Sequence, residues 1–494
     1  MKKLRALALT LAVLGMAFAL QPATTNAKVQ QDVIKIGALG PLAITPGKDM
    51  QDGANLAVKE INEAGGIDVG GTPYDVELIV ESTSNPSTGL PDATEGVTGL
   101  NKLQDQDNVV ASIGLFRTEV TVACMAHMDR PFLGVGSTAP IITPYFWRVG
   151  PSNGTQLTRS LIDLYAFGLG AQQGVRKVTI VRENAAWSLA MRGPIAAYLS
   201  SGLGGALPFN MTFTADIVID EGASLDSVTT SLTPVADDVD ALMPIFSGPA
   251  GRHITRAWAS LDMPQYLAGI NVEAQSSTHF EETQGAAYGE IELETLPPDI
   301  EKTPKTKPFR EAFKDEYGEL PTYTAFASYD SVYLIKAAIE AADSTAVADI
   351  QAELSTIDYQ GAAYNIKFTN EPGSQWGVAD NGTKVPIPGT PDNITVHDLY
   401  TRGTVGVVET KYIQGFYAQW QQGGVKKTIW TTLDETVATR NVTKHIEWPI
   451  DHAEHGWEED TGEGDEIPGF ELPMVLLVLG NLAMIVHLQR RKKR

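Results

Sequence analysis

Cysteine is almost absent from the sequence, because Cys124 is the single cysteine among 494 residues. One cysteine can form neither a disulfide within the chain nor a CxxC pair, which excludes a disulfide-stapled scaffold and a thioredoxin-like redox site. Cys124 lies among apolar residues and is expected to pack in a core. The sequence also lacks a glycine-rich phosphate-binding loop and a dinucleotide fingerprint, so we expect no cofactor.

Positive charge is also scarce. The chain has 37 Lys and Arg against 60 Asp and Glu, which gives a formal net charge of −23. Such a surface repels nucleic acid and favours solubility, so we expect no nucleic-acid partner. With 43% apolar residues over 494 positions, the chain can form two or three domain-sized cores.

Both ends carry sorting patterns. Residues 1–27 have a basic start, an apolar run and a small-residue cleavage site, which is typical of a secretory signal peptide; an uncleaved anchor helix is the alternative. Residues 473–488 are almost wholly apolar and precede a basic tail, which predicts a transmembrane helix with its tail in the cytoplasm. Because the tripeptide PGF stands just before this helix, residues 468–494 resemble the archaeal PGF-CTERM sorting signal. The resemblance implies an exported protein anchored at the outer face of the cell membrane, with the acidic residues 436–467 as a tether.

Residues 109–140 predict a strand, a loop, a helix, a second strand and a second loop. Thr118 is expected to be the N-cap of the helix. The carboxyl ends of parallel strands lie at one edge of a sheet, where open α/β sheets bind ligands. Both loops offer hydroxyls and backbone amides but no general base, which favours the holding of a small polar molecule. The alternative is that these Ser and Thr residues only cap helices.

The whole chain continues this alternation, so we expect an α/β protein with two doubly wound parallel-sheet lobes. Strands of the first series are expected at 33–39, 74–80, 109–113 and 132–135, with helices at 48–64 and 92–103. Residues 146–149 are expected to be a strand that leaves this sheet. The second series is expected to have strands at 175–181, 213–219, 241–246 and 265–270, and helices at 156–168, 187–199, 225–232 and 252–261. Later elements are expected at 288–296, 308–317, 325–342, 359–368 and 415–420, and residues 369–410 are expected to be a surface insertion.

From residue 33 to about residue 430 the chain resembles the type I periplasmic binding proteins of the Leu/Ile/Val receptor group. The stretches that carry the resemblance are VIKIGALGPL, LAVKEINEAGGI, RPFLGVGSTAPIITPYFWRVGPSNGTQ, ASYDSVYLIKAAIEAA and KYIQGFYAQWQQGGVKKTIW. The resemblance implies two lobes joined by three crossings, closing on a small polar ligand and delivering it to an ABC permease. Lobe 1 would comprise residues 33–147 and 291–352, and lobe 2 residues 148–290 and 353–435; the receptor would be a monomer.

The resemblance also implies site residues. For a ligand carboxylate they are Phe116, Arg117, Thr118, Gly136, Ser137 and Thr138, for an aromatic lid Trp187, and for an ammonium group Ser247, Gly248, Asn271 and Glu273. The sequence departs from the family where Arg117 replaces a Ser or Thr, and where Asn271 stands at the acid position with Glu273 two residues later. Amino acids, amides, urea-like compounds and organic acids therefore all stay open as ligands. Arg117 as a solvated helix-start residue, Trp187 as interdomain packing and Glu273 as a surface carboxylate are the alternatives.

Other functions have weaker support. Residues 150–154 match the GxSxG pattern of an esterase with Ser152 as nucleophile, but Pro151 stiffens the turn, so we expect no enzyme. His452 and His455 could hold a metal, although no fold is expected around them, so we predict no metal site. A surface-anchored sensory or adhesive module is the main alternative to an import receptor.

Overall fold

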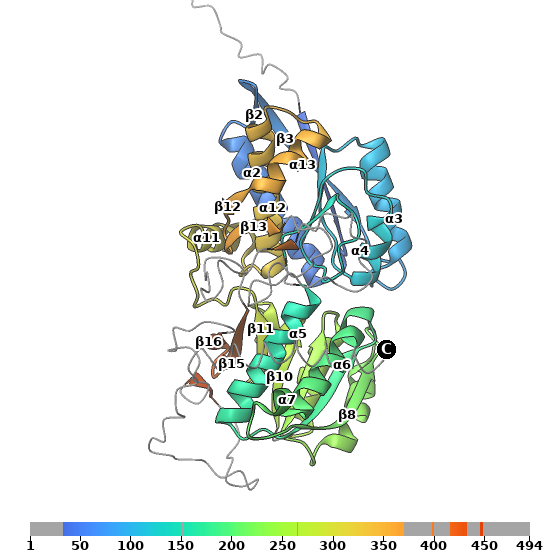
Figure 1. Ribbon diagram of the computed structural model, residues 1–494, viewed down its shortest axis with the longest axis vertical. Coiled ribbons are helices and arrows are strands. Elements are labelled where there is room, and N and C mark those ends of the chain that lie inside the picture. Colours follow the sequence, from blue (N-terminus) through green and yellow to red (C-terminus); the bar gives the residue numbers. More distant parts are fainter. Residues whose placement is uncertain are drawn as a thin grey trace, which may run out of the picture.

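The computed structural model describes residues 33–150, 153–263, 265–369, 398–399, 415–431 and 445–447. It shows two lobes stacked along the long axis of the molecule (Figure 1). The predicted signal peptide, most of the expected insertion, nearly all of the acidic tether, the PGF segment with its helix, Ser152, His452 and His455 lie outside the described residues. Within the described part of the chain, no helix has the length and apolar character needed to cross a membrane.

The first lobe is built on a six-stranded sheet in the order β2-β3-β1-β4-β5-β6, parallel except for β2. Its strands are β1 (Val33–Gly40), β2 (Ile67–Val69), β3 (Thr72–Ser82), β4 (Ala111–Gly114), β5 (Phe132–Gly134) and β6 (Phe146–Arg148). Helices α2 (Thr45–Glu63) and α12 (Tyr323–Ala342) cover one face, and α3 (Ala93–Asn101) and α4 (Thr118–Met125) cover the other. The expectation that residues 146–149 leave the sheet is wrong, because β6 pairs in parallel with β5 and its three side chains are buried.

The second lobe is built on a seven-stranded sheet in the order β16-β15-β11-β10-β9-β7-β8. Its strands are β7 (Lys177–Glu183), β8 (Thr212–Ile219), β9 (Ala241–Phe246), β10 (Tyr266–Asn271), β11 (Ile291–Glu294), β15 (Phe416–Gln421) and β16 (Val425–Thr431). Helices α5 (Gly154–Asp163) and α6 (Ala186–Ser200) pack in one core cluster, and α8 (Leu225–Leu232) and α9 (Ala250–Ser260) in the other. Since both sheets carry helices on both faces, the structure has the expected pair of doubly wound lobes.

The polypeptide crosses between the two lobes at other places than the sequence suggested. Strand β11 pairs with β10 in the second sheet, although residues 291–352 were expected in lobe 1. Residues 358–368 pack in the core of the first lobe, although lobe 2 was expected to resume at residue 353. They form the hairpin of β12 (Asp358–Gln360) and β13 (Asn365–Thr369), where one strand was expected. The hairpin turn is held by the buried Asp330, which accepts hydrogen bonds from the backbone N–H groups of Ala362 (2.6 Å) and Ala363 (3.2 Å).

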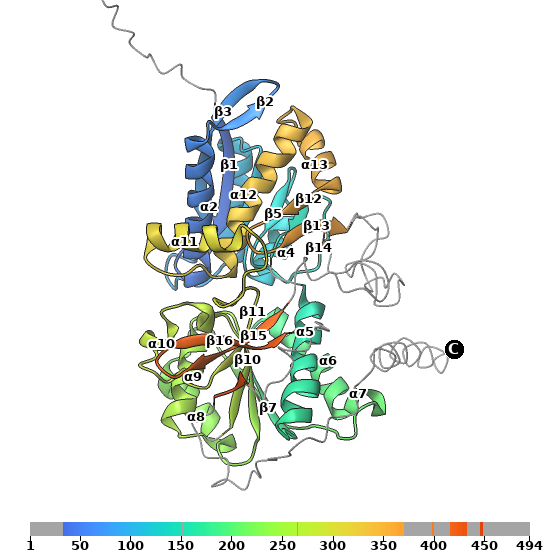
Figure 2. The same ribbon diagram turned by 90° about the vertical axis from the view of Figure 1, so that its left-hand side faces the viewer.

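The crossings therefore follow β6, β11 and the small sheet that contains β13. The second crossing runs from β11 to α11 (Thr306–Tyr317), and it lies between the lobes in the side view (Figure 2). After α12 the chain adds α13 (Val347–Thr356) and β12 to the first lobe. The short strand β14 (Asp398–Leu399) pairs with β13, and β15 with β16 then closes the edge of the second sheet.

Candidate functional site

A cavity of about 50 Å³ lies between the lobes, where strands of both sheets end. From the first lobe it is lined by Phe116, Arg117, Thr118, Gly136, Thr138 and Tyr323. From the second lobe it is lined by Leu157, Trp187, Ser247, Ile270, Val272, Gln275, Leu293 and Thr295. A cavity of this size holds a few water molecules at most, since one water needs about 10–15 Å³.

Seven of the eleven expected site residues line this cavity. They are Phe116, Arg117, Thr118, Gly136, Thr138, Trp187 and Ser247. Thr118 is not the N-cap of α4, because Arg117 holds that position with an extended backbone. The Thr118 hydroxyl instead lies 3.2 Å from the Thr138 hydroxyl, so the two predicted loops meet as expected at the edge of the sheet.

Ser137 points into the fold and does not line the cavity. Its hydroxyl accepts a hydrogen bond from the backbone N–H of Ala139 at 3.1 Å, and it is fully buried. The guanidinium of Arg148 donates to the carbonyl oxygens of Ser137 and Ala139. Ser137 therefore supports the turn that presents Thr138.

Asn271 and Glu273 are also turned away from the cavity. The Asn271 amide donates to the Glu290 carboxylate at 2.7 Å, inside the second lobe. The Glu273 carboxylate is buried and lies 2.7 Å from Nε of Arg252, and burial raises the pKa of Glu273. The alternative of a surface carboxylate for Glu273 does not hold either, because the residue is buried.

The sequence interpretation missed Glu183, which does not line the cavity but bonds to three residues that do. It is the last residue of β7 and is 0% exposed. Its carboxylate accepts hydrogen bonds from the backbone N–H groups of Ser247 and Gly248, both at 3.0 Å, from the Ser247 hydroxyl at 2.7 Å and from the indole N–H of Trp187. Gly248, which does not line the cavity, thus reaches the site through this carboxylate. An acid at the end of a buried strand, four residues before Trp187, is the sequence signal that could have indicated it.

Arg117 crosses from the first lobe to this carboxylate. Its guanidinium donates to Glu183 and, at 2.6 Å, to the Ser247 hydroxyl. The same guanidinium contacts Glu221, which is 17% exposed. Because Arg117 is only 2% exposed, it is not the solvated helix-start residue of the alternative interpretation. Since Arg117 lines the cavity, an ion pair between the lobes lies directly beside it.

A buried lysine supports the second-lobe wall from behind. Lys426 donates to the carbonyl oxygens of Ala274 (2.8 Å) and Gln275 (2.9 Å), and to the carboxylate of Glu292 at 2.9 Å. It also donates to the buried carboxylate of Glu294. Burial raises the pKa of Glu292, and the positive charge of Lys426 opposes this rise.

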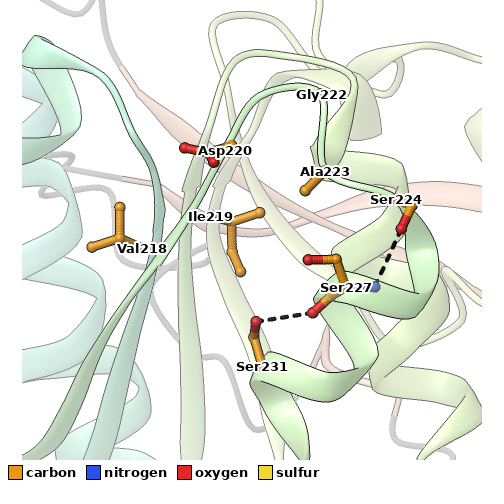
Figure 3. Close-up of a pocket in the computed structure, with 8 residues that line it drawn as sticks. All are labelled: Val218, Ile219, Asp220, Gly222, Ala223, Ser224, Ser227 and Ser231. Atoms are coloured by element: carbon orange, nitrogen blue, oxygen red, sulfur yellow. Dashed lines mark hydrogen bonds between the residues drawn. The ribbon is translucent and has the colours of Figure 1, made fainter.

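A second hollow of about 440 Å³ lies on the second lobe between the end of β8 and α8 (Figure 3). Its hydroxyls are used locally. Ser224 accepts a hydrogen bond from the backbone N–H of Ser227 at 3.3 Å, and Ser231 donates to the carbonyl oxygen of Ser227 at 2.9 Å. These bonds are ordinary helix capping and helix bonding, so the hollow does not compete with the cavity between the lobes. Among the described residues, no cluster of three or more His, Cys, Asp or Glu side chains could hold a metal ion.

Comparison with protein families gives one match. Residues 33–378 match the family described as periplasmic binding protein. A comparison with curated proteins finds no match.

Solved structures share the fold. The leucine-binding protein LivK of Thermotoga maritima has a TM-score of 0.61 and 17% identity, over 81% of this chain and 98% of its own. The branched-chain amino acid transporter substrate-binding protein LivJ of Streptococcus pneumoniae, in complex with isoleucine, has a TM-score of 0.58 and 18% identity, over 81% and 99%. A solute-binding protein of an ABC transporter from R. palustris, in complex with benzoate, has a TM-score of 0.60 and 15% identity, over 81% and 96%.

Proposed function

The chain belongs to the periplasmic binding protein family, and from this membership we propose that it is an extracytoplasmic solute-binding receptor of an ABC importer. The family consists of binding proteins and not of enzymes. The observation that carries the proposal is the cavity between the lobes, whose walls come from both sheets. A ligand held there contacts both lobes at once, so its binding favours the closed arrangement.

The size of the cavity requires the lobes to part before a ligand enters. Its volume of about 50 Å³ is far below the roughly 300–1,000 Å³ of small-molecule sites. The lobes meet outside the cavity in single hydrogen bonds, such as the one from Arg252 to the Thr45 hydroxyl at 3.1 Å and the one from the Leu320 N–H to the Ser277 hydroxyl at 3.2 Å. Such isolated polar contacts can be exchanged for water when the lobes separate.

The lining supports a ligand with a polar head and an apolar body. The hydroxyls of Thr118 and Thr138 lie in the first-lobe wall, while Leu157, Ile270 and Val272 line the second-lobe wall. Branched-chain or other amino acids, amides, urea-like compounds and organic acids are the ligand classes to be compared, because similar structures hold isoleucine and benzoate.

Thermal unfolding with a panel of these four classes tests the receptor function. A ligand at 100 times its Kd stabilises the folded protein by about 2.7 kcal/mol, which a shift in Tm reports. If no class of compound raises the Tm, the receptor proposal fails. Uptake of the labelled ligand by cells then separates import from the sensory or adhesive alternative.

Export and anchoring are proposed from the sequence alone, since residues 1–27 and 468–494 lie outside the described residues. The mature receptor would be a monomer at the outer face of the membrane, held near its ABC permease by the acidic tether. Mass spectrometry of the membrane-associated protein tests both ends. An intact residue 1 would contradict a cleaved signal peptide, and a protein found only in the medium would contradict anchoring.

A further inference from the structure

The chain contains five Asn-x-Thr triplets, the acceptor sequence for N-linked sugars. Asn153 and Asn210 belong to the described part of the chain, whereas Asn381, Asn393 and Asn441 lie outside the described residues. A sugar is bulky and polar, so an asparagine can carry one only if the folded chain leaves its side-chain amide in contact with solvent. The fold therefore distinguishes between the first two triplets.

The first triplet is closed to a sugar. Asn153 is 5% exposed, and its Nδ2 atom donates to the buried carboxylate of Asp398 at 3.2 Å. Its Oδ1 atom accepts a hydrogen bond from the backbone N–H of Gln156 at 3.0 Å. A sugar on Nδ2 would have to displace Asp398, which also accepts the hydrogen bond from the buried Arg148. The folded protein therefore excludes Asn153 as a sugar carrier.

The second triplet has the opposite geometry. Asn210 and Thr212 are exposed, while Met211 between them is 2% exposed. The burial thus alternates as in an extended chain, where residues i and i+2 share one face, so the amide and the hydroxyl are presented to solvent together. Within the described part of the chain, no hydrogen bond involves the Asn210 side chain. A transferase and the sugar that it adds both have access to this amide.

The neighbours of Asn210 hold it at the surface and leave space beside it. The guanidinium of Arg176 lies over the Phe209 ring, 3.8 Å from its centroid, and the Met211 N–H donates at 3.1 Å to the last turn of α6. Helix α7 (Gly202–Gly205) has the sequence GLGG, and a Cβ added at its first residue would lie 2.5 Å from the Asn210 amide oxygen. Because α7 is mostly glycine, few side chains compete with a sugar for the space beside this amide.

We propose that Asn210 is a glycosylation site of the exported protein. The donor is an oligosaccharide ester of a lipid phosphate. The Nδ2 atom of Asn210 forms a bond to C1 of the first sugar, and the bond from C1 to the phosphate oxygen breaks. The lipid phosphate keeps the bonding electrons, and the amide releases one proton. This inference rests on the proposed export, since such acceptors are used in secreted proteins, but it does not depend on the ligand of the receptor.

A sugar at Asn210 would protect one edge of the second sheet. The residue lies just before β8, which among the described strands pairs with β7 alone and ends the sheet. The free edge of a strand can pair with another chain. Strand β8 has eight residues and spans about 26 Å, and the ligand cavity lies at the opposite, carboxyl ends of the strands. Helix α7 lies on the outer side of the second lobe (Figure 2), so the sugar leaves ligand entry open.

Mass spectrometry of the protein, purified from the surface of the cells that naturally produce it, tests the site. We expect a peptide that contains Asn210 to carry the added mass of a sugar chain, and the tryptic peptide 149–159 with Asn153 to have its unmodified mass. Asn210 found only unmodified, in a protein that has lost residues 1–27, overturns the inference and leaves export and the receptor function intact. A sugar on Asn153 overturns the argument from burial. If residue 1 is intact, export fails and the inference falls with it, whereas ligand binding is measured separately.

Two substitutions of the exposed Thr212 form a matched pair. Thr212→Val keeps the shape of the side chain but destroys the triplet, so the sugar mass should be lost, whereas Thr212→Ser keeps an acceptor triplet and should retain the sugar. A sugar that remains on Thr212→Val overturns the inference.

Light scattering on warming tests the protective role. Thr212→Val should begin to aggregate at a lower temperature than Thr212→Ser, because its edge strand lacks the sugar. Both variants made in a bacterium that lacks the transferase carry no sugar and should aggregate alike. The same onset for both variants from the natural host, or a difference that persists without the sugar, overturns the protective role.

Discussion

Replacing Arg117 by methionine should open the ligand-free protein without unfolding either lobe. Methionine has a similar length but cannot balance the negative charge of Glu183, which is 0% exposed in the closed arrangement. Removing one partner of a buried ion pair costs about 3–5 kcal/mol. The conformations of a two-state protein usually differ by only a few kcal/mol, so the ratio of open to closed protein should rise at least ~100-fold. The lobes can escape the cost by separating, and therefore the Tm of unfolding should change little.

Small-angle X-ray scattering measures this opening as an increase in the radius of gyration of Arg117→Met. The double variant Arg117→Met/Glu183→Gln is the control, since it removes both charges and leaves neither buried without a partner. Its scattering should return toward that of the wild type. An unchanged scattering curve for Arg117→Met with normal unfolding would show that the ion pair does not hold the lobes together.

Three further predictions concern other parts of the molecule. Thr138→Ala should weaken ligand binding about 3- to 10-fold in calorimetry, whereas Ser137→Ala should chiefly lower the free energy of unfolding by ~1 kcal/mol, because one hydroxyl lines the cavity and the other supports the turn; equal effects on affinity would contradict the placement. Burial raises the pKa of Asp49 to about 6, so the folded state binds the proton more tightly than the unfolded state. This carboxyl should therefore reduce stability as the pH rises from 4 to 7, by up to roughly 3 kcal/mol, and Asp49→Asn should remove that part of the slope in urea unfolding. Lys426→Met should lower the free energy of unfolding by about 3–5 kcal/mol, because two buried glutamates lose their cation, while the exposed Lys427→Met should change it by less than about 0.5 kcal/mol; similar values for both would refute the role of the buried charge.

Local patterns in the sequence predict much of the fold. The helix 225–232 and the strand 241–246 have the expected bounds, because their apolar spacing is determined within the segment itself. The sheet to which a strand belongs is harder to predict, since it depends on a partner strand far along the chain. Strand β11 has no local pattern that assigns it to β10. The hairpin of β12 and β13 is predicted as one strand, because its turn is held by Asp330, which lies 32 residues before Ala362.

The same limit applies to the site. The loops that carry Thr118 and Thr138 could be predicted, because both follow strands of one parallel sheet. The pair of Arg117 and Glu183 joins residues 66 positions apart in different lobes, and no spacing rule connects them. Asn271 ends β10 as expected for a site residue, but its amide turns toward Glu290, a direction that depends on the packing of α9 and not on the strand.

Neither lobe is continuous in the chain, and this affects the order in which the polypeptide can fold. Arg148 is fully buried and donates at 2.8 Å to Asp398, which lies 250 residues later. The sheet of the second lobe is likewise incomplete without β15 and β16, which end at residue 431. During synthesis, both halves stay incomplete until most of the polypeptide has left the ribosome, and contacts this distant form slowly. A chain that folds late stays unfolded for longer, which suits the proposed export through a narrow membrane channel.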